Sequence, residues 1–211
     1  MDSKSKQNVG TAESGNGRVS PVATAAKPVE LFATGVAGLD DILGGGLARN
    51  HLYLIEGDPG TGKTTIAMQF LMEGMGRGQK ALYVTLSESK TELLEIAASH
   101  GWSIDGIEIF ELGPDEKHLK PEAQYTVFNP AEIEMADTTN AMLSEVERTQ
   151  PERIVIDSLS ELRLLARDSL RYRRQILGLK QYFAGRNCTV LLLDDRTAER
   201  HDLQQIGRAH V

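Results

Sequence analysis

The chain has 211 residues, 40% of them hydrophobic and 25% charged, a composition typical of a globular protein with one sizeable core. Its formal net charge of −7 argues against a dominant, sequence-independent grip on nucleic acid, which requires a basic surface. No apolar run reaches the roughly 18–20 residues that span a bilayer, and the N-terminal residues lack the apolar segment of a signal peptide. The single cysteine, Cys188, excludes an internal disulfide and suits the reducing cytoplasm, where we expect the protein to be located.

Residues 1–30 are rich in Ser, Gly, Lys, Ala and Thr, with almost no large apolar side chains. Such a segment cannot bury enough surface to offset the entropy of ordering it, so we expect a disordered N-terminal tail. The folded core is expected to begin at residue 31. Residues 34–47 predict a short helical turn closed by glycines.

A strand, a glycine-rich loop and a helix are predicted next. Residues 52–56 form a short apolar run suited to a buried strand, and residues 65–75 carry apolar side chains at helical spacing. The residues between them match the phosphate-binding pattern G-x-x-x-x-G-K-[ST] and are followed by a further threonine: Gly57, Asp58, Pro59, Gly60, Thr61, Gly62, Lys63, Thr64 and Thr65. Backbone N–H groups of such a loop bind phosphate oxygens, Lys63 reaches the β/γ-phosphates, and the Thr64 hydroxyl binds Mg²⁺.

Strands and helices alternate along the rest of the chain. The sequence predicts strands at 81–86, 107–112, 153–157 and 188–193, with an extra strand at 124–128. Helices are predicted from a capping box at Ser89–Glu92 through residue 99, over 137–149, and from Asp168 or Ser169 through residue 184. This order predicts an α/β fold, with a mainly parallel sheet covered by helices on both faces.

Asp157 ends the apolar strand 153–157. Ligands of open α/β sheets bind at the carboxyl ends of the strands, where the phosphate loop would also emerge. An acid after an apolar strand is by itself a common loop residue. Beside an intact phosphate loop, we interpret Asp157 as the residue that holds a water on Mg²⁺.

Other acidic residues at strand ends leave alternatives open. Glu88, after strand 81–86, is either a catalytic carboxylate that orients or deprotonates the attacking water, or a favourable charge at the start of the next helix. Asp194 and Asp195 end the last strand. They either sense the γ-phosphate or Mg²⁺ or are simply polar residues leaving the sheet, and we favour the second interpretation.

Four arginines recur at intervals of four, four and three residues: Arg163, Arg167, Arg171 and Arg174. A continuous helix would align them on one face. The helix start expected at Asp168–Ser169 interrupts this run. We therefore predict a solvated or subunit-contacting face in preference to a nucleic-acid-binding one.

Together these motifs resemble the KaiC-like branch of the RecA-type ATPases. The resemblance is carried by the phosphate loop and by residues 34–35, 39–41, 44–47, 83–88, 101–102, 156–160 and 172–174. It implies a RecA-like P-loop NTPase core that binds ATP with Mg²⁺ between neighbouring subunits of a ring, commonly a hexamer, and hydrolyses it slowly. By position, it implies phosphate contact and a catalytic role for Lys63, Mg²⁺ contact for Thr64 and Asp157, and a catalytic carboxylate in Glu88.

The chain departs from the clock-type members in two respects. They place two adjacent glutamates where this chain has Ser87 and Glu88, so we expect slow hydrolysis. They also carry two fused ATPase domains, whereas one is expected here, incomplete at its C-terminus, over residues 31–205. Residues 206–211 match an in-frame translation of a sequencing adapter, and we expect them to be a non-native tail.

The function expected from these observations is a slow, Mg²⁺-dependent ATPase acting as an oligomeric switch or signalling scaffold. Two alternatives remain open at this stage: a RecA/RadA-type DNA-dependent ATPase, and a nucleotide-binding interaction module with negligible hydrolysis. The acidic balance makes nucleic acid the less favoured partner. Protein partners are compatible with the sequence, and no membrane partner is expected.

Overall fold

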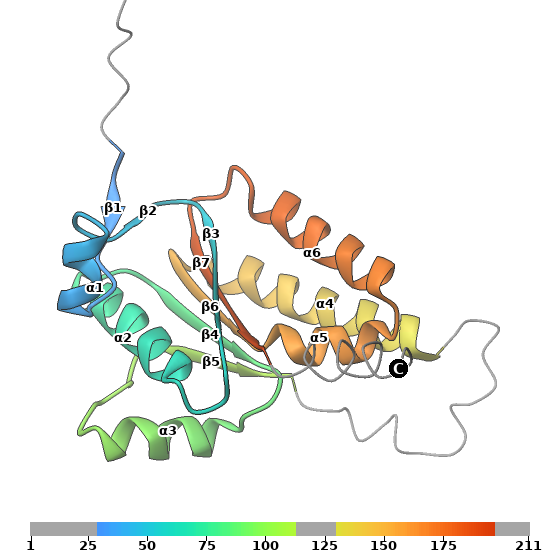
Figure 1. The fold of residues 1–211 in the computed structure, drawn as a ribbon, viewed down its shortest axis with the longest axis horizontal. Helices are drawn as coiled ribbons and strands as arrows, with labels where there is room; N and C mark the ends of the chain where they lie inside the picture. Colours follow the sequence, from blue (N-terminus) through green and yellow to red (C-terminus); the bar gives the residue numbers. More distant parts are fainter. Residues whose placement is uncertain (1–28, 113–129, 197–211) are drawn as a thin grey trace, which may run out of the picture.

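The computed structural model describes residues 29–112 and 130–196 (Figure 1). Residues 1–28 of the predicted tail, the predicted strand at 124–128 and the predicted non-native residues 206–211 lie outside the described residues.

A five-stranded parallel sheet forms the centre of the described fold. In spatial order its strands are β3 (Leu52–Gly57), β7 (Thr189–Asp195), β6 (Arg153–Asp157), β4 (Ala81–Thr85) and β5 (Glu108–Glu111). Every residue of β4 and β6 is buried, as expected of apolar strands covered on both faces. Because all five strands run parallel, their carboxyl ends meet at one edge of the sheet.

Helices cover both faces of this sheet (Figure 1). On one face lie α2 (Lys63–Gly76) and α3 (Lys90–Ser99). On the other lie α4 (Pro130–Thr149), α5 (Leu159–Ala166) and α6 (Ser169–Phe183). The predicted RecA-like α/β core, with a mainly parallel sheet and helices on both faces, is therefore confirmed. No helix within the described ranges is long and apolar enough to cross a membrane.

The N-terminal part of the core packs beside α2. It contains α1 (Ala37–Ile42) and a small antiparallel sheet of β1 (Leu31–Phe32) and β2 (Leu47–Ala48). The Asp40 carboxylate accepts hydrogen bonds from the backbone N–H groups of Thr34 at 2.7 Å and Gly35 at 3.2 Å. The short helix is confirmed, whereas β1 and β2 were not predicted because two-residue strands carry no periodic signal.

The capping box of α3 is confirmed. The Ser89 side chain accepts from the Glu92 N–H, and the Glu92 carboxylate accepts from the Ser89 N–H at 2.7 Å. Helix α4 begins at Pro130, several residues before the predicted start.

The structure contains a helix that the sequence analysis did not predict, α5, over residues 159–166. Its buried side chains, Leu159, Leu162 and Ala166, follow a helical period too short to stand out from the sequence. Arg167 then adopts a positive φ of 53°, and the Asp168 carboxylate caps α6. The predicted interruption of the arginine run is therefore confirmed.

Strand β6 directs Arg153, Val155 and Asp157 toward the α2 face, since alternate side chains share one side of a strand. Arg153 is fully buried between the rings of Phe32 and Phe70, with its guanidinium carbon 4.4 and 4.6 Å from their centroids. Its Nη1 donates to the carbonyls of Ala33 and Phe70, both at 2.7 Å. Burial lowers the pKa of this guanidinium to about 10. Arg153 thus attaches the segment before α1 to the body of the domain.

We expect Arg153→Lys to destabilise the fold by about 2–4 kcal/mol, because lysine leaves a charge buried without the planar stack and the forked hydrogen bonds. The measurement is the free energy of unfolding from urea titration. Arg77→Lys is the matched control, since Arg77 forms an exposed i,i+4 pair with Glu73 and should change stability by less than about 0.5 kcal/mol. Equal unfolding midpoints for both variants would show that the buried guanidinium is dispensable.

Candidate functional site

The predicted phosphate loop joins the carboxyl end of β3 to the start of α2. Gly60 and Gly62 have φ angles of +78° and +89°, a region that side-chain-bearing residues rarely adopt. A Cβ on Gly57 would lie 2.6 Å from the Thr61 hydroxyl oxygen. The backbone conformation therefore favours glycine at Gly60 and Gly62, and a side chain at Gly57 would require the Thr61 side chain to move. The loop ends at Gly62, the residue before α2, so the N-terminal end of that helix opens onto it.

Lys63, the first residue of α2, folds back over this loop. Its Nζ donates to the carbonyl oxygens of Gly57 at 3.1 Å and Asp58 at 3.0 Å. The same ammonium forms an ion pair with Asp195 Oδ1 at 2.7 Å. The side chain is only 11% exposed, so the positive charge is held inside the site.

Thr64 and Asp157, predicted as magnesium ligands, lie together at the carboxyl edge of the sheet. The Thr64 hydroxyl donates to Asp157 Oδ2 at 3.4 Å. The buried Tyr83 hydroxyl donates to the same oxygen at 2.5 Å. Burial raises the pKa of the Asp157 carboxyl, while the hydrogen bonds from Tyr83 and Thr64 oppose that shift.

Sequence reasoning missed Tyr83 as a partner of Asp157. Its ring belongs to the core cluster beneath α2, and its pKa is raised well above the ordinary value by burial, with a further contribution from Asp157. The hydroxyl therefore keeps its proton and acts as a donor. The strand Ala81–Thr85 alone carries no signal for this contact, which depends on β4 pairing with β6.

Glu88 follows β4 at the same edge of the sheet. Its backbone is fixed by Thr85, whose Oγ1 accepts from the Glu88 N–H at 3.0 Å and donates to the Glu88 carbonyl at 2.7 Å. Burial raises the pKa of the Glu88 carboxyl to about 7, the nearby charge of Asp157 adds to this shift, and Lys63 opposes it. The carboxyl oxygen Oε2 is buried and has no hydrogen-bond partner among the described residues. Ser89 and Glu92 already cap α3, so the helix start does not depend on Glu88.

This arrangement fits a nucleotide with Mg²⁺. Magnesium in phosphate-binding sites is usually held by one or two protein oxygens together with phosphate oxygens and water. The Thr64 hydroxyl and the Asp157 carboxylate supply oxygen donors of that kind. The backbone amides of the loop and the Lys63 ammonium are donors of the kind that bind phosphate oxygens.

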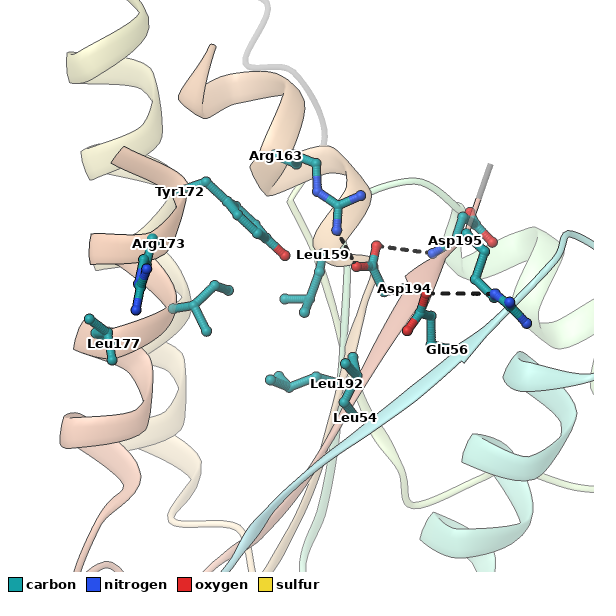
Figure 2. Close-up of a pocket in the computed structure, with 12 residues that line it drawn as sticks. Leu54, Glu56, Leu159, Arg163, Tyr172, Arg173, Leu177, Leu192, Asp194 and Asp195 are labelled. Atoms are coloured by element: carbon teal, nitrogen blue, oxygen red, sulfur yellow. Dashed lines mark hydrogen bonds and ion pairs between the residues drawn. The ribbon is translucent and has the colours of Figure 1, made fainter. Parts of the chain in front are cut away.

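The two acids that end β7 differ in their contacts (Figure 2). Asp194 is buried and accepts from Arg163 at 2.5 Å and from the Ser160 hydroxyl at 2.8 Å, which joins α5 to β7. The interpretation of Asp194 as a polar residue at the sheet end agrees with these contacts. Asp195 instead contacts Lys63, and sequence reasoning did not predict this contact. The contact depends on the β3–β7 register, which pairs Asp195 with Gly57 and which the sequence alone does not reveal.

A cavity of about 510 Å³ lies between β3 and β7 on one side and α5 and α6 on the other (Figure 2). Leu54, Leu159 and Leu192 contribute apolar surface, while Arg163, Arg173 and the acids of β7 add charge. The groove lies on the sheet face opposite α2.

Comparisons with known proteins agree with this description. The family described as "ATPase: KaiC" matches residues 32–211 of the chain. A UPF0273 protein of Thermotoga maritima is 29% identical over 179 residues, which cover 78% of this chain and 69% of the relative. A UPF0273 protein of Methanopyrus kandleri is 28% identical over 194 residues, 87% of this chain and 74% of that protein. The circadian clock oscillator protein KaiC of Picosynechococcus sp. is 33% identical over 151 residues, which cover 72% of this chain but 27% of the clock protein. The chain belongs to the KaiC ATPase family.

Proposed function

We propose that this chain binds ATP with Mg²⁺ at the loop Gly57–Thr65 and hydrolyses it slowly. The observation that carries the proposal is the meeting of four residues from three segments at one edge of the sheet: Lys63 and Thr64 at the start of α2, Asp157 at the end of β6 and Glu88 after β4. Burial raises the pKa of both Asp157 and Glu88, the charge of Asp157 further raises the pKa of Glu88, and the charge of Lys63 opposes both shifts. Perturbed carboxyl groups of this kind concentrate at catalytic sites.

Each residue has a defined role in this proposal. The amides of the loop and the start of α2 bind phosphate oxygens, and Lys63 balances the charge of the β- and γ-phosphates. Thr64 and Asp157 would hold Mg²⁺, with Tyr83 fixing one oxygen of Asp157. Magnesium, when bound, would neutralise charge on the phosphates.

Glu88 is proposed as the carboxylate that orients or deprotonates the attacking water. Its unpartnered oxygen is available to accept a hydrogen bond. A pKa near 7 suits a general base at neutral pH, because an appreciable fraction is ionised while the group still has affinity for a proton.

We further propose that the protein acts as a cytoplasmic ring, of a size such as a hexamer, and serves as an oligomeric switch or signalling scaffold. Support comes from membership of the KaiC family and from the relative whose name describes a clock oscillator. In related phosphoryl-transfer systems, a basic residue reaching the nucleotide in trans is worth about 10³–10⁵ in rate. Protein partners fit this role better than nucleic acid, given the net charge of −7.

The test measures ATP binding by calorimetry with and without Mg²⁺, and phosphate release over a dilution series of the protein. We expect Mg²⁺-dependent binding, slow turnover and a specific activity that falls steeply as assemblies dissociate. Constant specific activity through dissociation would contradict a shared active site. Absence of binding at millimolar Mg-ATP would contradict the proposal as a whole.

A second candidate function is a nucleotide-binding interaction module with negligible hydrolysis. The observation that favours it is Ser87, which leaves Glu88 as the single carboxylate in the segment between β4 and α3. Single-turnover measurements distinguish the two functions. Tight binding of Mg-ATP with no phosphate release would support the interaction module.

A further inference from the structure

Asp195 provides the third acceptor for the Lys63 ammonium. An ammonium group has three protons to donate. Lys63 Nζ lies 3.1 Å from the Gly57 carbonyl oxygen, 3.0 Å from the Asp58 carbonyl oxygen and 2.7 Å from Asp195 Oδ1. The shortest of these contacts, and the only charged one, is with Asp195. A phosphate oxygen that binds Lys63 must therefore replace one of these three acceptors.

The position of Asp195 follows from the order of the strands. Strands β3 and β7 are neighbours in the sheet, and their register pairs Gly57 with Asp195. The backbone N–H of Arg196 donates to the Gly57 carbonyl at 3.3 Å, which continues the pairing to the first residue of the loop. The pairing of β3 with β7 therefore places the Asp195 carboxylate next to the phosphate loop.

The ion pair between Lys63 and Asp195 lies among further negative charges, which affects how the site would receive a polyphosphate. Asp157, Glu88 and Asp195 all surround one cation, and the charge of Asp195 raises the pKa of both other carboxyl groups. A polyphosphate would add further negative charge to the same space. Asp195 would then lose its favourable partner and face repulsion from the incoming phosphate.

We propose that Asp195 competes with a phosphate oxygen for the Lys63 ammonium and thereby sets the affinity of the site for nucleotide. This inference rests on the proposed function, since it concerns the same loop. Nucleotide binding is an exchange of one anion for another on Lys63. The cost of releasing Asp195 lowers the affinity for every nucleotide that uses this lysine.

The test measures the dissociation constant of Mg-ADP by calorimetry for the wild-type chain, Asp195→Asn and Glu56→Gln. ADP avoids turnover, and asparagine keeps the size and hydrogen-bonding groups of the side chain while removing its charge. Glu56 is the matched control, because it precedes the loop and loses the same charge but pairs with Arg196 at 3.8 Å instead of Lys63. We expect Asp195→Asn to bind Mg-ADP about tenfold more tightly, and Glu56→Gln to stay within about twofold of wild type.

Each result decides between the alternatives. Equal or weaker binding by Asp195→Asn, with normal wild-type binding, would overturn the inference and leave the proposed function intact. Weaker binding would instead identify Asp195 as a ligand of the nucleotide complex. Equal gains in both variants would also overturn it, since they would reflect net charge alone. If neither wild type nor Asp195→Asn binds Mg-ADP or Mg-ATP, the proposed function fails. Binding by Asp195→Asn alone would support both.

Discussion

The Glu88→Gln variant is expected to bind Mg-ATP with an affinity close to wild type and to release phosphate at least about a hundredfold more slowly. A positioned general base typically contributes about 10²–10⁴ in rate, and glutamine cannot accept the proton. Binding should persist because the proposed phosphate contacts come from the loop and Lys63, and none comes from Glu88. Calorimetry gives the affinity, and single-turnover phosphate release gives the rate.

The matched control is Glu95→Gln, which removes the same charge from an exposed position on α3. It should leave the rate unchanged. Wild-type turnover in the Glu88 variant would remove this residue from the catalytic role. Loss of both binding and turnover would point to a disturbed loop, which thermal unfolding of the variant would reveal.

The pH profile of the same reaction provides a further measure of the role of Glu88. A base works in its deprotonated form, and the Glu88 pKa is raised to about 7. Turnover should therefore rise as the pH increases from about 6 to 8 and then level off. The residual activity of Glu88→Gln should lack this rise. A wild-type profile that is flat across this range would contradict proton acceptance by Glu88.

The parts of the site that sequence reasoning located are those carried by local patterns. The spacing of glycines, lysine and threonine in the loop is local, and its φ angles agree with the need for glycine. Asp157 was found through a rule about parallel sheets, because the carboxyl ends of all strands meet at one edge. Its contact with Thr64 shows that this rule was sufficient to bring the two residues together.

The missed features depend on which strands are neighbours. Tyr83 reaches Asp157 because β4 lies beside β6, and Asp195 reaches Lys63 because β7 lies beside β3. Neither adjacency follows from the residues of one strand. Arg153 is similar, since an arginine at a strand start suggests a solvated end, yet Gly74 leaves room for it beneath α2. A Cβ at Gly74 would lie 2.4 Å from the Arg153 side chain.

Lys63→Ala is expected to weaken binding of Mg-ATP at least about thirtyfold. Removing one partner from a largely buried, hydrogen-bonded charge pair typically costs about 2–5 kcal/mol, which is about 30- to 5,000-fold in affinity. The measurement is calorimetric titration of Mg-ATP. Lys180→Ala is the control, because it deletes an exposed lysine on α6, remote from the loop, and should bind as wild type does.

A double variant with the net charge of wild type distinguishes two causes of weak binding by Lys63→Ala. One is loss of the contact between Lys63 and phosphate, and the other is the excess negative charge left in the site. Lys63→Ala alone leaves Asp157, Glu88 and Asp195 without their opposing cation, so repulsion of phosphate could by itself explain weak binding. Lys63→Ala with Asp195→Asn removes one charge of each sign and keeps the net charge of wild type. We expect this double variant to remain at least about thirtyfold weaker than wild type, because no group replaces the ammonium as a donor to phosphate. Wild-type affinity in the double variant would mean that Lys63 serves only to neutralise Asp195, and phosphate recognition would then rest on the backbone amides of the loop.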